Sequence, residues 1–506
     1  MRFGRCRAVA LVGLSATVVD VEAQLGSGLP AFHIVGLPDA ALGESRERVR
    51  GALESCALAL PGKRMVVNLS PAGLPKNGAG FDLAIAVALV CADGIEGAHR
   101  ARERVHIGEL GLDGRVHPVR GILPMVSAAV AAGHTEVVVS AGNEREAALV
   151  PGVRVRAIEH LSEVLREYGA AIEPDVGWEP LPRPAPLGRS EDSEDLADVI
   201  GQPEARYALE VAAAGGHHLL MSGPPGAGKT MLARRLPTIL PNLSDPDAVE
   251  VTSIHSVAGR FAPEGGLIRR PPFEAPHHTA SRAAIVGGGS GMPMPGAVSI
   301  AHRGVLFLDE APEFPAAVLQ TLRQPLESGE IHLHRATASA VYPARFQMVL
   351  AANPCPCGGS RCRCAPMDVR RYRAKLSGPL VDRVDIRLTV PRVTRAMRAL
   401  DERQEGSATV AVRVAEARAR AARRFADLPW SVNGDAPGSW LRKSLRGEVR
   451  IPLERAVDEG RLSMRGVDRV LRVAWSLADL RGRDELSAPL VGEALALRGG
   501  EDVVAA

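Results

Sequence analysis

Short runs of consecutive apolar residues alternate with helical segments through the first part of the chain. Strand-like runs occupy residues 65–69, 105–110 and 136–139, a charged helical pattern occupies residues 44–50, and an apolar helical run occupies residues 81–90. Alternation of this kind predicts an α+β or mixed α/β domain of modest size over residues 1–170.

A second region, residues 196–395, contains apolar runs that do not alternate with polar residues. Residues 304–308 and 346–352 are almost entirely apolar and lead into polar side chains, which is the pattern of a parallel strand covered on both faces. Residues 396–506 contain long amphipathic helical stretches instead. The pattern predicts an α/β multidomain protein with a parallel-sheet core and a C-terminal helical lid. Proline and acidic residues between the first two regions predict an extended linker over residues 171–195.

The junction between the apolar run at residues 218–221 and the helical segment that follows is rich in glycine. It carries the P-loop pattern, formed by Gly223, Pro224, Pro225, Gly226, Ala227, Gly228, Lys229 and Thr230. Glycine lacks a Cβ atom, so the backbone N–H groups can approach phosphates closely, and the helix N-terminus adds its positive dipole. Lys229 is expected to reach the β- and γ-phosphates, and Thr230 to ligate Mg²⁺. ATP and Mg²⁺ are therefore the expected ligands.

Polar side chains end two of the expected parallel strands, at the edge where open α/β sheets bind ligands. Asp309 is suited to Mg²⁺ ligation, and Glu310 to activating the attacking water as a general base. Asn353 is suited to a sensor between the γ-phosphate and that water. The ordinary alternatives are an acidic start to the next helix for the two carboxylates and a strand-end amide turn for Asn353. Beside a P-loop, the pattern favours an ATPase.

Two further segments frame the expected site. Arg383 is suited to an arginine finger that acts on the ATP of a neighbouring subunit, which requires a homo-oligomer. Its alternative is a surface ion pair with Asp382 or Asp385. Ile200 and Gln202 precede the helix before the P-loop strand, in a segment that commonly borders the adenine pocket in the AAA+ class.

Two segments lie between the motifs. Residues 276–281, followed by the glycine-rich residues 286–291, are expected to form a flexible insertion without packed structure. Residues 329–335 and 341–345 predict the two strands of a hairpin before the strand that ends at Asn353.

Composition bounds the class of protein. The 506 residues suggest about three domains, and an apolar content of 46% is ample for their cores. The net charge of +3 gives no global field toward nucleic acid or membrane. The apolar run after Arg2, Arg5 and Arg7 continues as an alternating pattern without a convincing cleavage site, so strands are predicted there instead of a signal peptide. No apolar run reaches membrane-spanning length, and we expect a cytoplasmic protein.

Four cysteines follow the expected sensor within ten residues, at Cys355, Cys357, Cys362 and Cys364. Four thiolates at such spacing can form a tetrahedral Zn²⁺ site. The alternative is a loop of reduced free thiols. The remaining cysteines are scattered, so the set does not form a secreted disulfide framework.

Residues 108–122 and 128–133 resemble the proteolytic domain of Lon-type proteases, which use a Ser–Lys dyad. The loop that corresponds to the serine, residues 75–82, contains no serine, and Met125 stands where the lysine falls. The resemblance therefore implies a Lon-like fold, of the ribosomal S5 domain 2-like type, that serves as a scaffold. An ATP-dependent peptidase is disfavoured.

Nearly the whole chain resembles magnesium-chelatase-like AAA+ ATPases of the ComM/YifB subfamily. Long matches carry the resemblance, at residues 37–39, 45–49, 276–279, 301–310 and 353–358. It implies a hexameric ring whose pore faces the insertion and the hairpin, and a role in DNA branch migration, particularly during natural transformation. Single-stranded or branched DNA is then the expected partner. The alternative is a motor that remodels a protein complex, as the magnesium-chelatase subunit does.

The resemblance also assigns residues in the lid. Residues 462–469 correspond to the second sensor of the family, with Arg465 as the phosphate contact and Arg469 as the substitute; a solvated helix face is the alternative. The arginine-rich helix expected over residues 410–425 could contact DNA phosphates or simply face solvent.

Overall fold

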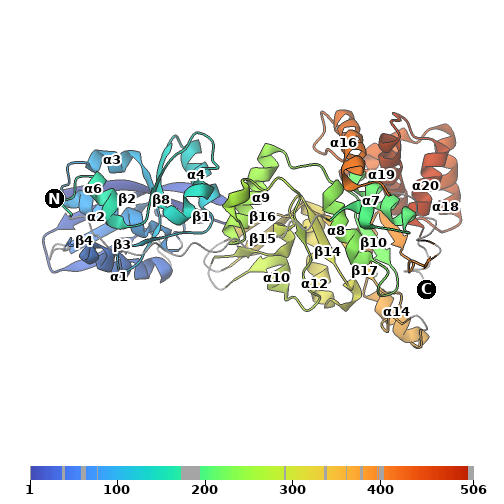
Figure 1. Ribbon diagram of the computed structural model, residues 1–506, viewed down its shortest axis with the longest axis horizontal. Coiled ribbons are helices and arrows are strands. Elements are labelled where there is room, and N and C mark those ends of the chain that lie inside the picture. The colour runs from blue at the N-terminus through green and yellow to red at the C-terminus, as the bar shows by residue number, and fades with distance from the viewer. Residues whose placement is uncertain are drawn as a thin grey trace.

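In the computed structural model, three parts of the chain lie in a row: an N-terminal part with one sheet, a central part with a second sheet, and a C-terminal group of helices (Figure 1). This arrangement confirms the expected fold class. The structure describes residues 2–36, 40–58, 64–76, 78–172, 194–289, 292–335, 339–359, 362–376, 380–395, 397 and 404–499. The expected linker falls almost wholly on residues 173–193, outside the described residues, as does the match at residues 37–39.

The N-terminal part is built on a seven-stranded mixed sheet in the order β3-β4-β2-β1-β5-β8-β9. Its strands are β1 (Arg2–Val12), β2 (Ser15–Gly26), β3 (Ala31–Val35), β4 (Arg64–Ser70), β5 (Val105–Ile107), β8 (Glu136–Ser140) and β9 (Arg154–Ile158), with β6 (Glu109–Leu110) and β7 (Val116–His117) as a separate pair. Its helices are α1 (Ala40–Ser55), α2 (Asp82–Asp93), α3 (Ala98–Glu103), α4 (Ile122–Ala131), α5 (Glu144–Ala147) and α6 (Leu161–Glu167). The apolar helix expected at residues 81–90 is thus α2.

Helix α2 supplies the centre of this core because it is apolar on all sides and almost wholly buried. Strand β1 approaches it so closely at Gly4 that a Cβ atom there would lie 2.0 Å from the carbonyl oxygen of Ala88. Only glycine permits that approach, so the first strand can carry the helix directly on its surface.

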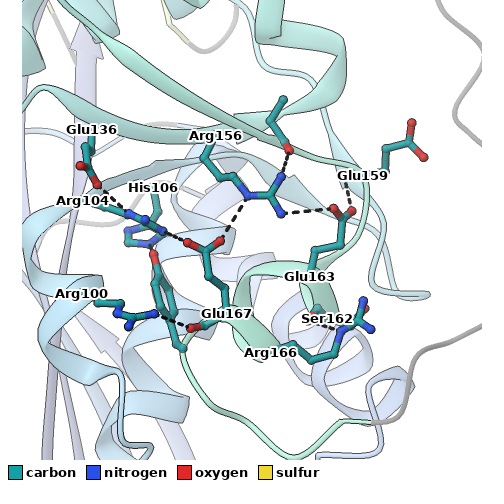
Figure 2. Close-up of polar contacts among 12 residues, drawn as sticks. Arg100, Arg104, His106, Glu136, Arg156, Glu159, Ser162, Glu163, Arg166 and Glu167 are labelled. Atoms are coloured by element: carbon teal, nitrogen blue, oxygen red, sulfur yellow. Dashed lines mark hydrogen bonds and ion pairs between the residues drawn. The ribbon is translucent and has the colours of Figure 1, made fainter.

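An ion-pair network closes the far edge of the same sheet (Figure 2). Arg104, which precedes β5, bonds Glu136 of β8 at 2.9 Å and Glu167 of α6 at 2.5 Å. Glu167 also accepts from Arg156 of β9 at 3.2 Å. Beneath them the buried ring of His106 lies 2.8 Å from the Tyr168 hydroxyl, and burial lowers the pKa of His106 to about 3. The network fastens α6 to three strands and lines no described cavity.

The central part contains a five-stranded sheet in the order β11-β14-β17-β10-β18, with every neighbouring pair parallel. Its strands are β10 (Leu219–Ser222), β11 (Phe273–Glu274), β14 (Val305–Leu308), β17 (Gln347–Ala352) and β18 (Ile386–Thr389). The helices around it are α7 (Pro203–Gly215), α8 (Lys229–Ile239), α9 (Asp245–Val257), α11 (Ala297–Ile300), α12 (Ala316–Thr321), α13 (Arg323–Ser328) and α14 (Pro366–Ala374). Strands β10, β14 and β17 are buried throughout, as their continuous apolar runs predict.

The glycine-rich insertion is ordered in its described residues, so the expectation of a segment without packed structure was wrong. It contains α10 (Arg282–Val286), β12 (Gly287–Gly288) and β13 (Met294–Pro295), and β12 pairs antiparallel with β13. A Cβ atom on Gly287, whose φ is 102°, would lie 2.4 Å from the Met294 carbonyl oxygen. The glycines therefore permit close backbone pairing here.

The expected hairpin is confirmed as β15 (Glu330–His334) paired with β16 (Ser339–Pro343). Alternate residues of both strands are buried or partly buried. Ala340 and Tyr342 of β16 join a core cluster with β1, α4 and β8 of the N-terminal part, and Leu333 of β15 packs against that cluster. At the same interface the Ser256 hydroxyl of α9 donates to the Glu146 carboxylate of α5. Burial raises the pKa of Glu146. One face of the hairpin thus holds the N-terminal part against the central one.

The C-terminal helices are α16 (Ser407–Arg424), α17 (Gly438–Leu441), α18 (Arg450–Asp458), α19 (Met464–Leu480) and α20 (Ala488–Arg498). Their buried residues form one core with α7, α8 and the second sheet. Several α16 arginines fasten this contact: Arg413 pairs with Glu210 of α7 at 2.7 Å, Arg418 donates to the Ala213 carbonyl at 2.8 Å, and Arg424 pairs with Asp479 of α19. For these three, neither DNA contact nor a plain solvent face describes what they do.

Candidate nucleotide-binding and hydrolysis site

The predicted P-loop lies between β10 and α8, at the carboxyl edge of the second sheet. Gly226 and Gly228 have φ values of 74° and 90°, in the region that favours glycine. Gly223 passes Val390 so closely that a Cβ atom would lie 2.2 Å from its carbonyl oxygen. The loop borders a cavity of about 420 Å³, which is lined by Pro225, Gly226, Ala227, Gly228, Lys229, Thr230, Met231, Asp309, Glu310, Ala352 and Asn353.

The Lys229 ammonium connects the P-loop to the strand that ends at Asn353. Its Nζ donates to the carbonyl oxygens of Gly223 at 2.7 Å and Pro224 at 3.1 Å, and to Asn353 Oδ1 at 3.2 Å. Burial lowers the pKa of Lys229, while the charges of Asp309 and Glu310 oppose that shift. The contact with Asn353 joins two motifs that lie 124 residues apart in the sequence.

Thr230 and Asp309 meet as a magnesium site requires. The Thr230 hydroxyl donates to Asp309 Oδ2 at 2.7 Å, and the other carboxylate oxygen accepts from the Glu310 backbone N–H at 2.9 Å. A hydroxyl and a carboxylate at hydrogen-bond distance offer two oxygen ligands to one ion, and Mg²⁺ at phosphates is held by one or two such protein oxygens. These residues therefore fit a Mg²⁺ ion bound with a nucleotide.

Glu310 has a partner that the sequence did not reveal. Its Oε2 lies 3.5 Å from Nδ1 of His278, and the His278 ring lies edge-on to Phe314 and stacks on His277 with centroids 4.1 Å apart. In the sequence, residues 276–279 belong to the expected flexible insertion and to the family resemblance, and neither assigns them a chemical role. The contact places this insertion segment beside the carboxylate expected to act as general base.

The two residues expected near the adenine pocket differ in placement. Gln202 Nε2 donates to the Ala227 carbonyl of the P-loop at 2.7 Å and to Pro391 at 3.3 Å. Ile200 is 46% exposed, a large apolar side chain at the surface. Neither residue lines the P-loop cavity, so Gln202 supports the loop from behind and Ile200 contributes an open apolar face.

The two arginines expected to sense phosphate lie outside the cavity lined by their own P-loop. Arg383 contacts Glu327 of α13, and this partner is neither of the two acids that its sequence alternative named. Burial and the nearby charges of Arg469, Arg323 and Arg465 lower the pKa of Arg383. Arg465 is highly exposed and lies 4.0 Å from Asp382. The structure therefore gathers these arginines at one place, away from the Lys229 ammonium.

The substitute sensor, Arg469, is engaged in a buried network. Its Nη1 lies 3.3 Å from Asp385, whose other oxygen lies 3.0 Å from Nδ1 of His217, and His217 Nε2 lies 2.7 Å from the Ser476 hydroxyl. Although burial opposes it, the hydrogen bond from His217 and the neighbouring arginines hold the pKa of Asp385 well below its usual range. The network ties the segment after Arg383 to α19. Arg469 is consequently bound to Asp385, whereas Arg465 is exposed.

The four clustered cysteines converge. Their four sulfur atoms all lie within 4.8 Å of one another. The sulfurs of Cys355 and Cys357 are 3.4 Å apart, and those of Cys357 and Cys362 are 4.0 Å apart; Cys364 supplies the fourth. A tetrahedral zinc ion with Zn–S bonds of about 2.3 Å needs sulfurs roughly 3.8 Å apart. Hydrogen bonds from the Gly359 backbone and the neighbouring thiols lower the pKa of Cys357 to about 6. The donor set fits zinc.

The cysteine loop also touches the nucleotide site. A Cβ atom on Gly358, whose φ is 59°, would lie 2.8 Å from the Pro225 ring of the P-loop. The loop thus packs directly behind the residues that border the cavity, an adjacency that the spacing of the cysteines did not predict.

The positions that correspond to the Lon-type dyad carry no dyad. Met125 is a buried side chain of α4 in the interface cluster. In the loop that corresponds to the serine, the buried Lys76 donates to the Pro71 carbonyl oxygen. No nucleophile faces a base here among the described residues, in agreement with the sequence.

Comparison with family models identifies the class of protein. Residues 195–398 match the model described as magnesium chelatase, subunit ChlI; residues 21–143 match subunit ChlI of Mg-chelatase; and residues 404–498 match its C-terminal region. Together with the parallel sheet and the P-loop, these matches make the chain a magnesium-chelatase-like AAA+ ATPase.

Full-length relatives define the family more narrowly. The chain is 38% identical to the competence protein ComM of Haemophilus influenzae over 493 residues, 97% of this chain and 96% of that protein. It is 40% identical to the uncharacterized protein YifB of Escherichia coli over 496 residues, with the same coverage. An uncharacterized protein of Mycobacterium tuberculosis, Rv2897c, is 50% identical over 504 residues, 98% of this chain and 99% of that protein. The chain belongs to the ComM/YifB family.

A shorter similarity concerns the Lon-like region. Lon protease 2 of Bacillus subtilis is 30% identical over 158 residues, which cover 30% of this chain and 28% of the protease. This similarity agrees with the expected N-terminal fold. No helix within the described ranges is long and apolar enough to cross a membrane.

Proposed function

We propose that this protein is a ring-forming motor that hydrolyses ATP to move on single-stranded or branched DNA. The observation that carries the ATPase part is the convergence of Lys229, Thr230, Asp309, Glu310 and Asn353 on one cavity. The DNA part is supported by the similarity to a competence protein over 97% of the chain. Because ATP, DNA and reduced thiols occur together in the cytoplasm, the proposal places the protein there.

The hydrolytic roles follow from the contacts within the cavity. Lys229 exchanges its carbonyl partners for phosphate oxygens, and Thr230 with Asp309 holds the Mg²⁺ that neutralises phosphate charge. Glu310 takes a proton from the attacking water, and Asn353 orients that water while keeping its contact with Lys229. Gln202 fixes the P-loop backbone, and Ile200 offers an apolar surface to the adenine.

The ring is proposed because two arginines expected to contact phosphate lie outside the P-loop cavity of their own chain. Arg383 and Arg465 lie close enough for their charges to interact, and neither lines the cavity of its own P-loop. In a ring, one subunit can present both to the ATP of its neighbour, where they neutralise charge that develops in the transition state. A hexamer is the ring size that the family resemblance implies.

The contact with DNA is proposed for the outer face of the β15–β16 hairpin. His332, His334 and Arg335 are exposed on it, while alternate residues hold the hairpin to the N-terminal part. Because its inner face is packed against the N-terminal part, the hairpin can move with the protein as a rigid unit and push on a bound strand. Nucleotide-driven movement of the central part would then displace a strand that contacts the outer face.

The test compares parent protein with His332→Ala/Arg335→Ala. We expect parent ATPase to rise with single-stranded or branched DNA and a branched junction to move, whereas the double variant keeps its basal rate and loses both responses. A matched control, His33→Ala/Arg64→Ala, removes the same residue types from the exposed edge of β3 and β4. It should behave as the parent does.

A second candidate function is remodelling of a protein complex, favoured by the match of residues 195–398 to a magnesium-chelatase subunit. A motor of that kind has no reason to respond to DNA. Parent protein that neither binds DNA at low salt nor changes its ATPase rate with it would establish this second candidate in place of the first.

Zinc in the cysteine loop is the remaining part of the proposal. Cys355, Cys357, Cys362 and Cys364 would hold one structural Zn²⁺ per chain, which fixes the loop that packs on Pro225. Elemental analysis of protein prepared without chelators should find about one zinc per chain, and Cys357→Ser/Cys362→Ser should lose it. Protein without stoichiometric metal would leave the loop as free thiols.

A further inference from the structure

A second cavity lies in the C-terminal helices and shares no residue with the P-loop site. It measures about 580 Å³, within the range of roughly 300–1,000 Å³ usual for small-molecule sites. Helices α16, α17 and α19, with the segments after the last two, provide its walls. The lining residues are Arg420, Arg423, Arg424, Trp440, Lys443, Trp475 and Asp484.

The charge of this cavity is strongly positive, since four cations face one carboxylate. Two of the cations serve the fold: Arg424 pairs with Asp479, and Arg420 donates to the Asp479 carbonyl oxygen at 2.8 Å. Arg423 and Lys443 are exposed, and within the described residues the side chain of neither makes a hydrogen bond or ion pair. Their donors are therefore available to an anion.

Aromatic rings form the other part of the lining. Trp440 is half-buried and is held at 69° to Phe425, with ring centroids 5.0 Å apart, and at 51° to Trp475 with centroids 6.4 Å apart. The Arg424 guanidinium lies 4.1 Å from the Trp475 ring centroid. These contacts fix the orientation of the indoles, so a planar ligand that stacks on Trp440 loses little to reorganisation.

We infer that this cavity binds a nucleotide unit, with its base on Trp440 and its phosphate between Arg423 and Lys443. Flat aromatic surface beside unpaired cations is how proteins hold single-stranded nucleic acid without regard to sequence. The inference extends the proposed DNA function by adding a strand contact in the lid, apart from the hairpin. Because the lid also carries Arg465 on α19, a strand held here would be joined to the helix that faces a neighbouring ATP.

The test measures the affinity of a fluorescent oligothymidylate at low salt, without added ATP or ADP, because either nucleotide would compete for the same cavity. Arg423→Ser/Lys443→Ser should weaken binding about 10-fold or more and reduce the salt slope of log affinity by about 0.7, the value for one lost phosphate contact on a single strand. Trp440→Leu should weaken binding while changing the salt slope little. Basal ATPase should be unchanged in both variants.

A matched control removes two charges elsewhere in the C-terminal part. Arg446→Ser/Arg450→Ser affects exposed arginines that do not line the cavity, and it should bind the oligonucleotide as the parent does. Because the side chains of Arg423 and Lys443 make no hydrogen bond or ion pair with the described residues, their variant should fold normally. The conservative variant Arg423→Lys keeps the positive charge and should therefore bind the oligonucleotide nearly as tightly as the parent does.

Competition experiments distinguish three occupants of the cavity: a nucleic-acid strand, a free nucleotide and an acidic peptide. Displacement by unlabelled strand alone assigns the site to a polymer, whereas displacement by thymidine monophosphate assigns it to a free nucleotide. Polyglutamate that displaces the oligonucleotide equally well, with Trp440→Leu without effect, would overturn the inference in favour of an acidic peptide. Parent-like binding by Arg423→Ser/Lys443→Ser would overturn it while leaving the hairpin proposal intact. A parent that binds no DNA at all would defeat the proposed DNA function as well.

Discussion

Glu310 has a φ of 49°, in the left-handed region that a residue with a Cβ atom adopts at a cost of about 1 kcal/mol or more. The conformation turns the chain sharply out of β14, so that two consecutive carboxylates reach the same cavity. Asp309 then accepts the Glu310 backbone N–H and the Thr230 hydroxyl, and the Glu310 side chain is left for other chemistry. The strained conformation of Glu310 therefore separates the proposed metal ligand, Asp309, from the proposed general base, the Glu310 side chain.

The first prediction tests that separation. Glu310→Gln should keep ATP binding, because Lys229, Thr230 and Asp309 are intact, and should slow hydrolysis by about 10²–10⁴-fold, the usual worth of a general base. Binding is measured with a fluorescent ATP analogue, and hydrolysis by phosphate release. Lys229→Ala is the contrasting variant and should weaken binding itself. Hydrolysis by Glu310→Gln at the parent rate would remove Glu310 from the role of base.

A second prediction concerns the imidazole beside that base. His278 lies 3.5 Å from the Glu310 carboxylate, and a carboxylate engaged by a ring N–H is a poorer acceptor for the proton of water. His278→Ala should therefore raise basal ATPase severalfold and lower its stimulation by DNA. His277→Ala is the control, because that ring stacks on His278 without a described contact to Glu310. A basal rate equal to or below the parent rate would contradict the expectation.

At this scale the sequence predicts motifs better than partners. The eight P-loop residues, Asp309, Glu310 and Asn353 could be assigned because each stands beside a strand whose apolar run is visible locally. The partners of Arg383 and Glu310 could not, since Glu327 and His278 come from segments with no fixed spacing to them. Contacts between distant segments are set by packing, which residue spacing does not encode.

Among the elements, strands β10 and β17 carry the P-loop and Asn353, and one histidine links their starts. His218 Nδ1 accepts the backbone N–H of Met348 at 3.0 Å. Burial lowers the pKa of His218 to about 4, whereas an unfolded histidine titrates near 6.5. The unfolded chain therefore takes up this proton first as pH falls. The stability contributed by neutral His218 is present above about pH 6.5 and is lost toward pH 4.

The third prediction follows from this sign. Calorimetry of the parent protein should show the melting of the central part shifting to lower temperature between pH 7 and pH 5, with up to about 2 kcal/mol assigned to His218. His218→Asn keeps an acceptor in the place of Nδ1 and removes the titration, so its melting temperature should fall less over this range. The difference between the two proteins removes the contributions of the other titrating groups, which both proteins share. Parallel curves would assign the acid sensitivity elsewhere.

Element type was predictable where apolar periodicity is strong, and misleading where glycine dominates. The runs at residues 304–308 and 346–352 appear as β14 and β17, and the expected hairpin appears as β15 and β16. The prediction for the glycine-rich insertion was wrong because local composition shows only that glycine is common. It does not show that β12 pairs with β13, where a side chain on Gly287 would collide with Met294. For Arg413 and Arg424 of α16, the expected roles of DNA contact or solvent face were wrong for a related reason, because their partners Glu210 and Asp479 lie on other helices.

For the whole molecule, the hairpin interface joins the N-terminal part to the ATPase core. Buried Ala340 and Tyr342 of β16 share one core with β1, α4 and β8, partly buried Leu333 of β15 packs against it, and the Glu146–Ser256 hydrogen bond adds a buried polar tie. Fold class and the three-part order were predictable, since each part has its own hydrophobic pattern. The interface between the hairpin and the N-terminal part was not predictable, because nothing in the sequence distinguishes its apolar residues from those in the core of each separate part. In the proposed motor, this interface would give the Lon-like part a scaffold role that needs no peptidase chemistry.

The last prediction tests the ring itself. If Arg383 serves the ATP of a neighbouring chain, Arg383→Ala should hydrolyse slowly and still bind ATP, because its own P-loop cavity is intact. Lys229→Ala should fail to bind ATP but still present a normal Arg383. Mixing the two inactive proteins should then restore ATPase, since some interfaces combine an intact loop with an intact finger. Lys229→Ala mixed with Lys229→Ala/Arg383→Ala is the control and should stay inactive. An inactive first mixture, with mixed oligomers verified by native mass spectrometry, would place Arg383 outside the reaction of its neighbour.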